Sequence, residues 1–172
     1  PVSSGQLDTY RFLSLAWSSK LNYPSALKYS EKLMSAAAGS RFKHKYRQSL
    51  FDSSTLLASI GQARKALATR ERGLKLSLGD KNTYQARNFL ASLLLNSLYE
   101  DDLSNASRYL DQLNLLDKDG VFDFETTLGR AIISGLTGRR EISENTFNEL
   151  EKKTNYSPFT LPSWKKTIAE KN

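Results

Sequence analysis

The side chains that most often carry catalysis or hold metals are scarce in this chain. Cysteine is absent and histidine occurs once, at His44. Thiol nucleophiles, disulfides, cysteine-type zinc sites and metal sites that need two imidazoles are therefore excluded. His44 lies in a run of charged residues with no second ligand type beside it, which favours a surface histidine over a ligand or a general base. Because no nucleophile–base pair, phosphate-binding loop or metal motif can be assembled, the sequence predicts no enzyme and no cofactor.

Acidic residues gather in two stretches that invite a chemical interpretation. One is Glu100–Asp102, and the other holds Asp117, Asp119 and Asp123. Neighbouring carboxylates can serve in acid–base catalysis or bind calcium, but neither stretch has the glycine and terminal glutamate spacing of a calcium loop. The first also falls where a turn between helices is expected. We interpret both stretches as solvated turn carboxylates.

Basic residues are concentrated in the middle of the chain. The net charge is +7, and residues 41–81 hold ten Lys and Arg against three Asp and Glu, which accounts for the whole excess. The run RFKHKYR places aromatic rings between the cations Arg41, Lys43, Lys45 and Arg47. Such a run can contact phosphates while its rings stack on bases, and an acidic protein or a membrane surface is a further alternative. The favoured interpretation is a solvated turn whose cations are stabilised by the C-terminal dipole of the preceding helix.

The hydrophobic pattern that must position these residues is helical throughout. Ala26, Ala66 and Ala106 recur at a spacing of 40 residues, which indicates an internal repeat. Ala66 and Gly73 share one helix face, where another backbone can approach closely. We predict an all-α domain over residues 8–172, with residues 1–7 as a disordered end or an expression remnant. Its predicted elements are four helical hairpins (about 8–38, 44–79, 82–117 and 123–153) and a short capping helix (161–171).

The residues of these hairpins resemble the tetratricopeptide repeat over roughly residues 8–153. The matching positions are Tyr10, Leu13, Ser14, Trp17, Tyr23, Ala26, Tyr29 and Leu33 in the first unit, Leu50, Ser54, Leu57, Gly61, Ala66 and Gly73 in the second, and Leu128-Gly129 in the fourth. The chain departs from the family in its repeat length, which exceeds the usual length of about 34. It also lacks the proline at the repeat end and has Asn145-Thr146 where an alanine is expected. The longer spacing is similar to variants in bacterial signalling and regulatory proteins.

The resemblance implies a right-handed stack of antiparallel hairpins whose first helices line a concave groove. It also implies a non-enzymatic sensory or interaction module, part of a larger signalling protein, that binds a protein or peptide segment. The positions that match the family's groove are Arg11, Leu15, Ser18, Gln48, Phe51, Thr55, Asn88, Ala91, Leu95, Thr126 and Arg130. Family members that clamp a C-terminal carboxylate use Lys and Asn where this chain has Leu15 and Asp52, so a chaperone-tail function is not expected.

Two other functions compete with the groove. The basic hairpin 41–81 is a candidate nucleic-acid-binding surface of a regulatory domain. Self-association is the second alternative, because residues 100–125 hold eight acids and two cations and complement the basic hairpin. Light scattering at two salt concentrations separates that alternative from a monomer, since exposed charges are screened within about 8 Å at physiological salt.

The sequence leaves the compartment open. No apolar run approaches 18 residues and no signal peptide is evident, so no transmembrane segment is expected. The chain begins with Pro1, which suggests a fragment or a processed form. Trp17 is expected in the core, whereas Trp164 is expected either to cap the last hairpin or to fill the groove of a neighbouring copy.

Overall fold

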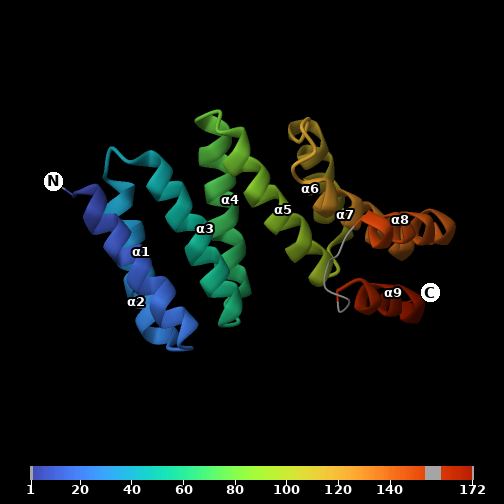
Figure 1. The fold of residues 1–172 in the computed structure, drawn as a ribbon, viewed down its shortest axis with the longest axis horizontal. Coiled ribbons are helices and arrows are strands. Elements are labelled where there is room, and N and C mark those ends of the chain that lie inside the picture. Colours follow the sequence, from blue (N-terminus) through green and yellow to red (C-terminus); the bar gives the residue numbers. More distant parts are fainter. Residues whose placement is uncertain (1, 154–159, 172) are drawn as a thin grey trace. The chain divides into compact units, whose positions relative to one another are not determined.

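The described part of the chain is entirely helical. The computed structural model describes residues 2–153 and 160–171, which form nine helices and no strand (Figure 1). The helices are α1 (Ser4–Ser19), α2 (Tyr23–Ala38), α3 (Lys43–Ser59), α4 (Ala63–Gly79), α5 (Thr83–Tyr99), α6 (Leu103–Leu116), α7 (Asp123–Leu136), α8 (Arg140–Lys153) and α9 (Thr160–Lys171). The predicted all-α fold of successive helical hairpins is confirmed for these residues. Among them, no helix combines the length and apolar character needed to cross a bilayer.

The first helix begins earlier than the sequence suggested. Ser3 is its N-cap, and the Ser3 hydroxyl accepts a hydrogen bond of 3.1 Å from the backbone N–H of Gln6. Leu7, one turn into the helix, has no exposed surface. Ser4–Leu7 therefore belongs to the folded chain rather than to a disordered end, and that expectation is wrong for these residues.

The turns within the hairpins repeat as the sequence does. Leu21, Gly61 and Asp101 are spaced by 40 residues, and each has a positive φ, of 58°, 78° and 58°. In the fourth hairpin Gly138 takes this conformation, with φ at 79°. Because the left-handed region is unfavourable for most side chains, the shared conformation shows that the repeat fixes the backbone of the turn even where glycine is absent.

In two of these turns the next residue caps the following helix through its side chain. Asn22 and Asp102 accept hydrogen bonds from the backbone N–H groups of Ser25 and Asn105, at 3.2 and 3.0 Å. The bonds from the Asn105 backbone and side chain lower the pKa of Asp102 below its ordinary value. Gln62 stands at the equivalent position but makes no capping bond, and its buried Oε1 atom has no hydrogen-bond partner in the structure. Its extra methylene group is consistent with the lost cap, since the preferred caps have shorter side chains.

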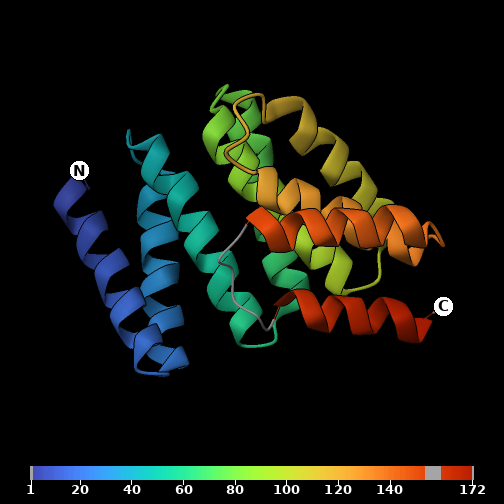
Figure 2. The same cartoon turned by 45° about the vertical axis from the view of Figure 1, so that its right-hand side comes forward.

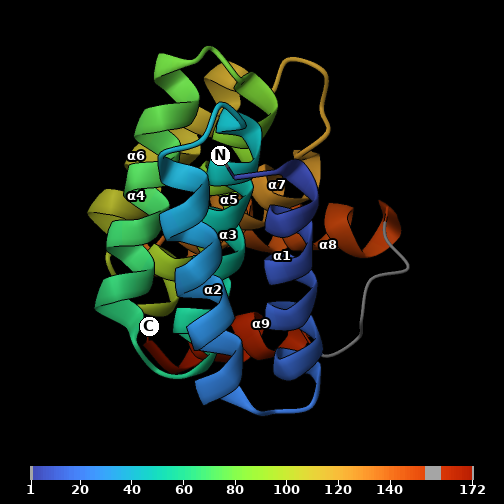
Figure 3. The same cartoon turned by 90° about the vertical axis from the view of Figure 1, so that its left-hand side faces the viewer.

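The helices fall into two units, residues 1–89 and 90–172, with the boundary inside α5. In unit 1, α1 packs on α2, α2 on α3 and α3 on α4; Figure 3 shows α1 and α2 side by side. The periodic Ala26 and Ala66 are fully buried, as expected of small residues at close helix contacts. An apolar cluster around Leu7, Leu33 and Ala37 joins α1, α2 and the start of α3, with Phe42 and Tyr46 among the side chains packed against it.

Close approach at Gly73 positions α5 within unit 1. A Cβ atom built at Gly73 would overlap three carbons of the Phe89 ring, so only glycine admits the ring there. Phe89 is 1% exposed, and its ring meets the edge of Phe51 at a centroid distance of 5.5 Å. The space that the sequence assigned to a closely approaching backbone is therefore filled at Gly73 by an aromatic side chain.

Unit 2 is organised around α7, whose residues from Thr126 to Gly135 are buried with the exception of the exposed Arg130. α6, α8 and α9 each pack on α7, and α9 lies below α8 in Figure 2. A Cβ atom at Gly135 would lie 2.7 Å from the side chain of Ile168. The glycine therefore allows α9 to pack closely on α7. Trp164 is 5% exposed and packs on Tyr99 with ring centroids 5.1 Å apart. Of the two predicted roles, it therefore has the one of capping its own unit.

Candidate binding face of unit 1

Side chains from α1, α3 and the start of α5 line two adjoining recesses in unit 1. Recess A has a volume of about 260 Å³ and is lined by Leu7, Asp8, Arg11, Leu33, His44, Lys45, Gln48 and Gln85. Recess B has a volume of about 180 Å³ and is lined by Arg47, Gln48, Phe51, Tyr84, Gln85, Asn88 and Phe89. Gln48 and Gln85 belong to both recesses, so the two adjoin. We call this surface the α1–α3–α5 face.

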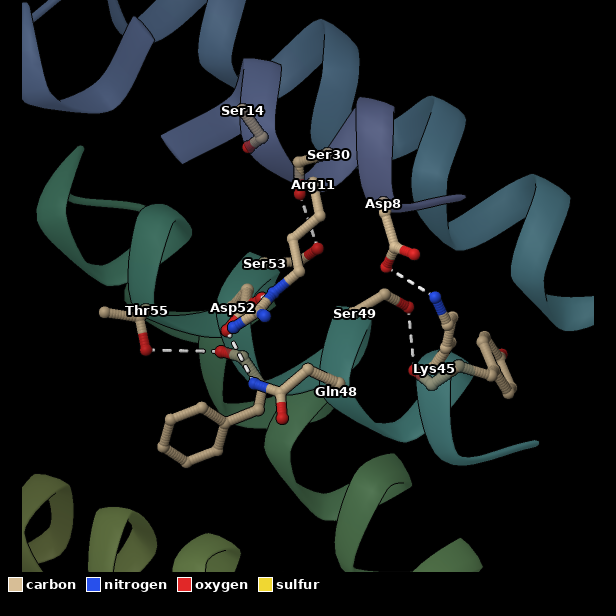
Figure 4. A network of polar contacts seen from close by, with 12 residues as sticks. Asp8, Arg11, Ser14, Ser30, Lys45, Gln48, Ser49, Asp52, Ser53 and Thr55 are labelled. Carbon is tan, nitrogen blue, oxygen red and sulfur yellow. Dashed lines mark hydrogen bonds and ion pairs between the residues drawn. The ribbon is translucent and has the colours of Figure 1, made fainter. Parts of the chain in front are cut away.

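Two ion pairs connect α1 to α3 at recess A (Figure 4). The Arg11 Nε–H donates to Asp52 at 2.6 Å, and the Lys45 ammonium group pairs with Asp8. Gln48 donates from its amide to the other carboxylate oxygen of Asp52 at 2.9 Å. The two pairs run in opposite directions, since each helix supplies one cation and one carboxylate. They therefore fix the position of α1 along α3.

A third ion pair lies beneath recess B. The Arg47 guanidinium is 7% exposed and donates to the carboxylate of Asp80 and to the amide oxygen of Gln85. Lys43 adds a second cation 3.7 Å from Asp80. A buried guanidinium needs such partners because removing a charge from water without them is costly. Arg47 thereby connects α3 to the α4–α5 turn and to α5, and it presents the amide of Gln85 to both recesses.

The remaining surface of recess B is aromatic and amide in character. Phe51 and Phe89 form its apolar wall, and the Tyr84 ring, 60% exposed, stands at its rim. Asn88 donates one amide hydrogen to the backbone oxygen of Tyr84 at 3.0 Å. This arrangement offers rings for apolar side chains and amide groups for hydrogen bonds, without a net charge of its own.

The basic run 41–47 does not form the solvated turn that the sequence favoured. Lys43, Lys45 and Arg47 lie in the first turns of α3, where the helix dipole disfavours cations, and not at the C-terminus of the preceding helix. Carboxylates compensate these cations: Asp8 pairs with Lys45, and Asp80 pairs with Arg47 and Lys43. Arg41 lies over the ring of Phe42 at 5.2 Å. A phosphate bound at Lys45 or Arg47 would have to displace a carboxylate.

The structure brings together part of the predicted groove. Arg11, Gln48, Phe51 and Asn88 line the recesses. The other predicted residues of unit 1 lie outside the recesses. Leu15 is 49% exposed on α1, and Ser18 is half-buried. Thr55 is exposed, and its hydroxyl donates to the backbone oxygen of Phe51 at 3.2 Å. In unit 2, Ala91 and Thr126 are buried, Leu95 is half-buried and Arg130 is exposed. The binding function of all these residues stays a prediction.

Comparison with protein-family models, with curated proteins and with solved structures finds no match. The candidate site therefore depends on the geometry of the chain itself. Within the part of the chain that the structure describes, no group of three or more His, Cys, Asp or Glu side chains is placed to hold a metal ion.

Several residues of the face were not anticipated from the sequence. Gln85 and Tyr84 line recess B, while Asp8 lines recess A and pairs with Lys45, which the sequence predicted only as a possible phosphate contact. The repeat does indicate Gln85, because Lys45 and Gln85 are 40 residues apart and so occupy the same repeat position. The ion pairs carried no such signal, since pairing between helices depends on how they pack.

Proposed function

We propose that this chain is a non-enzymatic binding module of the tetratricopeptide type. In this proposal the α1–α3–α5 face holds an extended peptide or protein segment. The observation that carries the proposal is the pair of adjoining recesses, because Gln48 and Gln85 link them into one continuous polar and aromatic surface. Four residues that the family resemblance assigns to the groove line this surface.

The size of the recesses supports a peptide over a small-molecule ligand. Each is smaller than the volumes of about 300–1,000 Å³ that are typical of small-molecule sites. The two adjoining recesses suit successive side chains of an extended chain, with the amide groups of Gln48 and Gln85 between them to bond its backbone. The resemblance extends the proposal to a module within a larger signalling or regulatory protein.

The charge of the α1–α3–α5 face favours peptide binding over nucleic-acid binding. Arg11, Lys45 and Arg47 each lie beside a carboxylate, so the face has no surplus of cations for a polyanion. A peptide held by rings and amides should therefore bind with little dependence on salt, whereas each phosphate contact steepens that dependence.

A phage-displayed library of random linear peptides, selected on the whole chain, tests the proposal. The enriched peptides are then titrated against Tyr84→Ala and Asn88→Ala, with Leu78→Ala as a matched control because Leu78 is 47% exposed on α4 of the same unit. Tyr84→Ala is expected to raise Kd by about tenfold or more, as for an aromatic hot spot. The control should leave Kd unchanged.

Two results would contradict this function. One is that no peptide is enriched over repeated selections. The other is that the enriched peptides bind Tyr84→Ala and Asn88→Ala as tightly as the unchanged chain, which would locate their site elsewhere.

A further inference from the structure

The outward face of α4 is a row of cations. At 3.6 residues per turn, the buried Ala66, Gly73 and Ser77 lie on one side of α4, toward the core of unit 1. The opposite side holds five exposed residues, which are Arg64, Lys65, Ala68, Arg72 and Lys75. We call its four cations, Arg64, Lys65, Arg72 and Lys75, the α4 basic face. Because this face lies opposite the side by which α4 packs, its exposure does not arise from the position of either end of the chain.

The charge of the α4 basic face is not compensated by carboxylates. Within residues 2–153 and 160–171, none of its four cations forms an ion pair. Arg72 lies over the ring of Tyr46, with its guanidinium carbon 5.4 Å from the ring centre. Glu71 is the only acid of α4, which has five Lys and Arg in all. The positive charge is therefore directed to solvent.

The preceding helix of the same hairpin shows the opposite arrangement. Lys45 of α3 pairs with Asp8, and Arg47 pairs with Asp80. The fold thus neutralises the cations of α3 and leaves those of α4 uncompensated. Like charges three or four residues apart on a helix, such as Arg72 and Lys75, are destabilising. A bound anionic partner would remove that cost.

The repeat extends the basic surface to α2. Lys28 and Lys32 stand 40 positions before Ala68 and Arg72, and both are exposed. Glu31 is the only acid of α2. Side chains of α2, α3 and α4 line one recess of about 330 Å³, and Figure 3 shows α2 and α4 at the same side of unit 1. The positive surface therefore covers the outward faces of two helices.

We propose that the α4 basic face binds the phosphate backbone of a double-stranded nucleic acid, without regard to its sequence. Arg64 and Lys75 are 11 positions apart, which is about 16 Å along the helix at 1.5 Å per residue. Each strand of a duplex carries one phosphate per 3.4 Å of axis, so this length faces about five phosphates. The four cations can thus contact successive phosphates.

The side chains between the cations select this occupant over other anionic partners. A protein interface has an apolar core, and a helix bound to a membrane surface buries apolar side chains among the lipids. On the outward side of α4 the only apolar side chain among the cations is that of Ala68, while Leu74 is buried. A phosphate backbone needs no apolar anchor, and phosphate contacts carry no sequence information.

The absence of rings favours a duplex over a single strand. Proteins that hold single strands stack aromatic side chains on the unpaired bases. The sequence of α4 contains no aromatic residue. The contact is therefore expected to be with the backbone of paired strands.

Fluorescence anisotropy of the whole chain with labelled DNA duplexes of two unrelated sequences, over a series of NaCl concentrations, tests the proposal. Both duplexes should bind with equal affinity. The double variant Lys65→Gln with Lys75→Gln removes two phosphate contacts, each worth about 0.9 in the slope of log K against log salt, so the slope should become shallower by about 1.8. An RNA duplex measured in parallel shows which of the two backbones binds more tightly.

The matched control removes the same charge elsewhere. Lys20→Gln with Lys152→Gln neutralises two exposed lysines, one at the end of α1 and one on α8. This control should leave the salt slope unchanged, and circular dichroism checks that both double variants remain folded. Tyr84→Ala, which tests the peptide site, should also leave duplex binding unchanged, so the two proposals can fail separately.

Three results would overturn the proposal. The first is that neither a DNA nor an RNA duplex binds at low ionic strength. The second is that the Lys65 and Lys75 double variant keeps the original salt slope, or loses no more of it than the control does. The third is that the α4 substitutions abolish binding to phosphatidylserine vesicles or to polyglutamate but not to a duplex, which would assign the face to a membrane surface or to an acidic protein.

Discussion

Unit 1 and unit 2 bring helices together by the same repeat but fill the contact with different side chains. In unit 1, the Arg11–Asp52 and Lys45–Asp8 ion pairs and a buried hydrogen bond between Ser30 and Ser53 join α3 to the first hairpin, beside the apolar cluster around Leu7. In unit 2, the helices that pack around α7 meet it through apolar groups: Ile132 and Ile133 are buried, and Leu94 lies against Gly129. The arrangement in successive helical hairpins is common to both units, whereas the chemistry of the contact is not.

The comparison shows which features the repeat fixes. It fixes the turn conformation shared by Leu21, Gly61 and Asp101 and the fully buried Ala26, Ala66 and Ala106, because these set where helices end and how closely they approach. The remaining contact positions are free to vary. Apolar contacts stabilise the fold in proportion to the area that they bury. The stabilisation from polar contacts depends on their geometry and on ionic strength. The candidate binding face lies in the unit where ion pairs and a buried hydroxyl pair add to the apolar contacts between helices.

The largest effect should come from unit 2. Leu94 has no exposed surface, so Leu94→Ala should lower the free energy of unfolding by about 2–5 kcal/mol through lost burial and the cavity that remains. Leu115→Ala removes the same atoms from a side chain that is 72% exposed and should change stability by less than about 0.5 kcal/mol. Urea unfolding followed by circular dichroism measures both. Equal losses in the two variants would contradict the apolar description of unit 2.

An intermediate effect is expected at the buried hydroxyl pair of unit 1. Ser53→Ala leaves the Ser30 hydroxyl buried without its partner and should cost about 1–3 kcal/mol. The double variant Ser30→Ala with Ser53→Ala removes both hydroxyls together and should recover most of that loss. Urea unfolding of the unchanged chain, of Ser30→Ala, of Ser53→Ala and of the double variant forms a double-mutant cycle. If the two single losses simply add, the hydroxyl pair does not join α2 to α3 in the way described.

The fold was predictable because its determinants are local and periodic. Helical spacing of apolar residues and the 40-residue recurrence of alanine were sufficient to predict the hairpins. The early start of α1 was missed although Ser3 and Gln6 have the spacing of a capping box, because the polar run PVSSGQ was interpreted as disordered.

The candidate site was only partly predictable, for a different physical reason. The family pattern identified Arg11, Gln48, Phe51 and Asn88 but not their partners. Arg11 and Asp52 are 41 residues apart, and which of several carboxylates a cation meets depends on the packing of whole helices rather than on local spacing. The same reason explains why the cations of residues 41–47 were expected in solvent although Arg47 is buried.

The smallest effect should come from the ion pair that crosses from α1 to α3. The Arg11 side chain is 45% exposed and that of Asp52 is 19% exposed, so the pair is largely screened by water. Arg11→Gln should therefore lower the free energy of unfolding by about 0.2–1 kcal/mol at low salt. In 1 M NaCl the loss should vanish, because the screening length falls to about 3 Å. The loss caused by Leu94→Ala should persist in the same buffer, since it arises from burial. If Arg11→Gln lowers the free energy of unfolding by more than this range, and by the same amount in high salt, the Arg11 side chain acts through packing and not through its charge. The two units would then differ only in the geometry of their helix contacts.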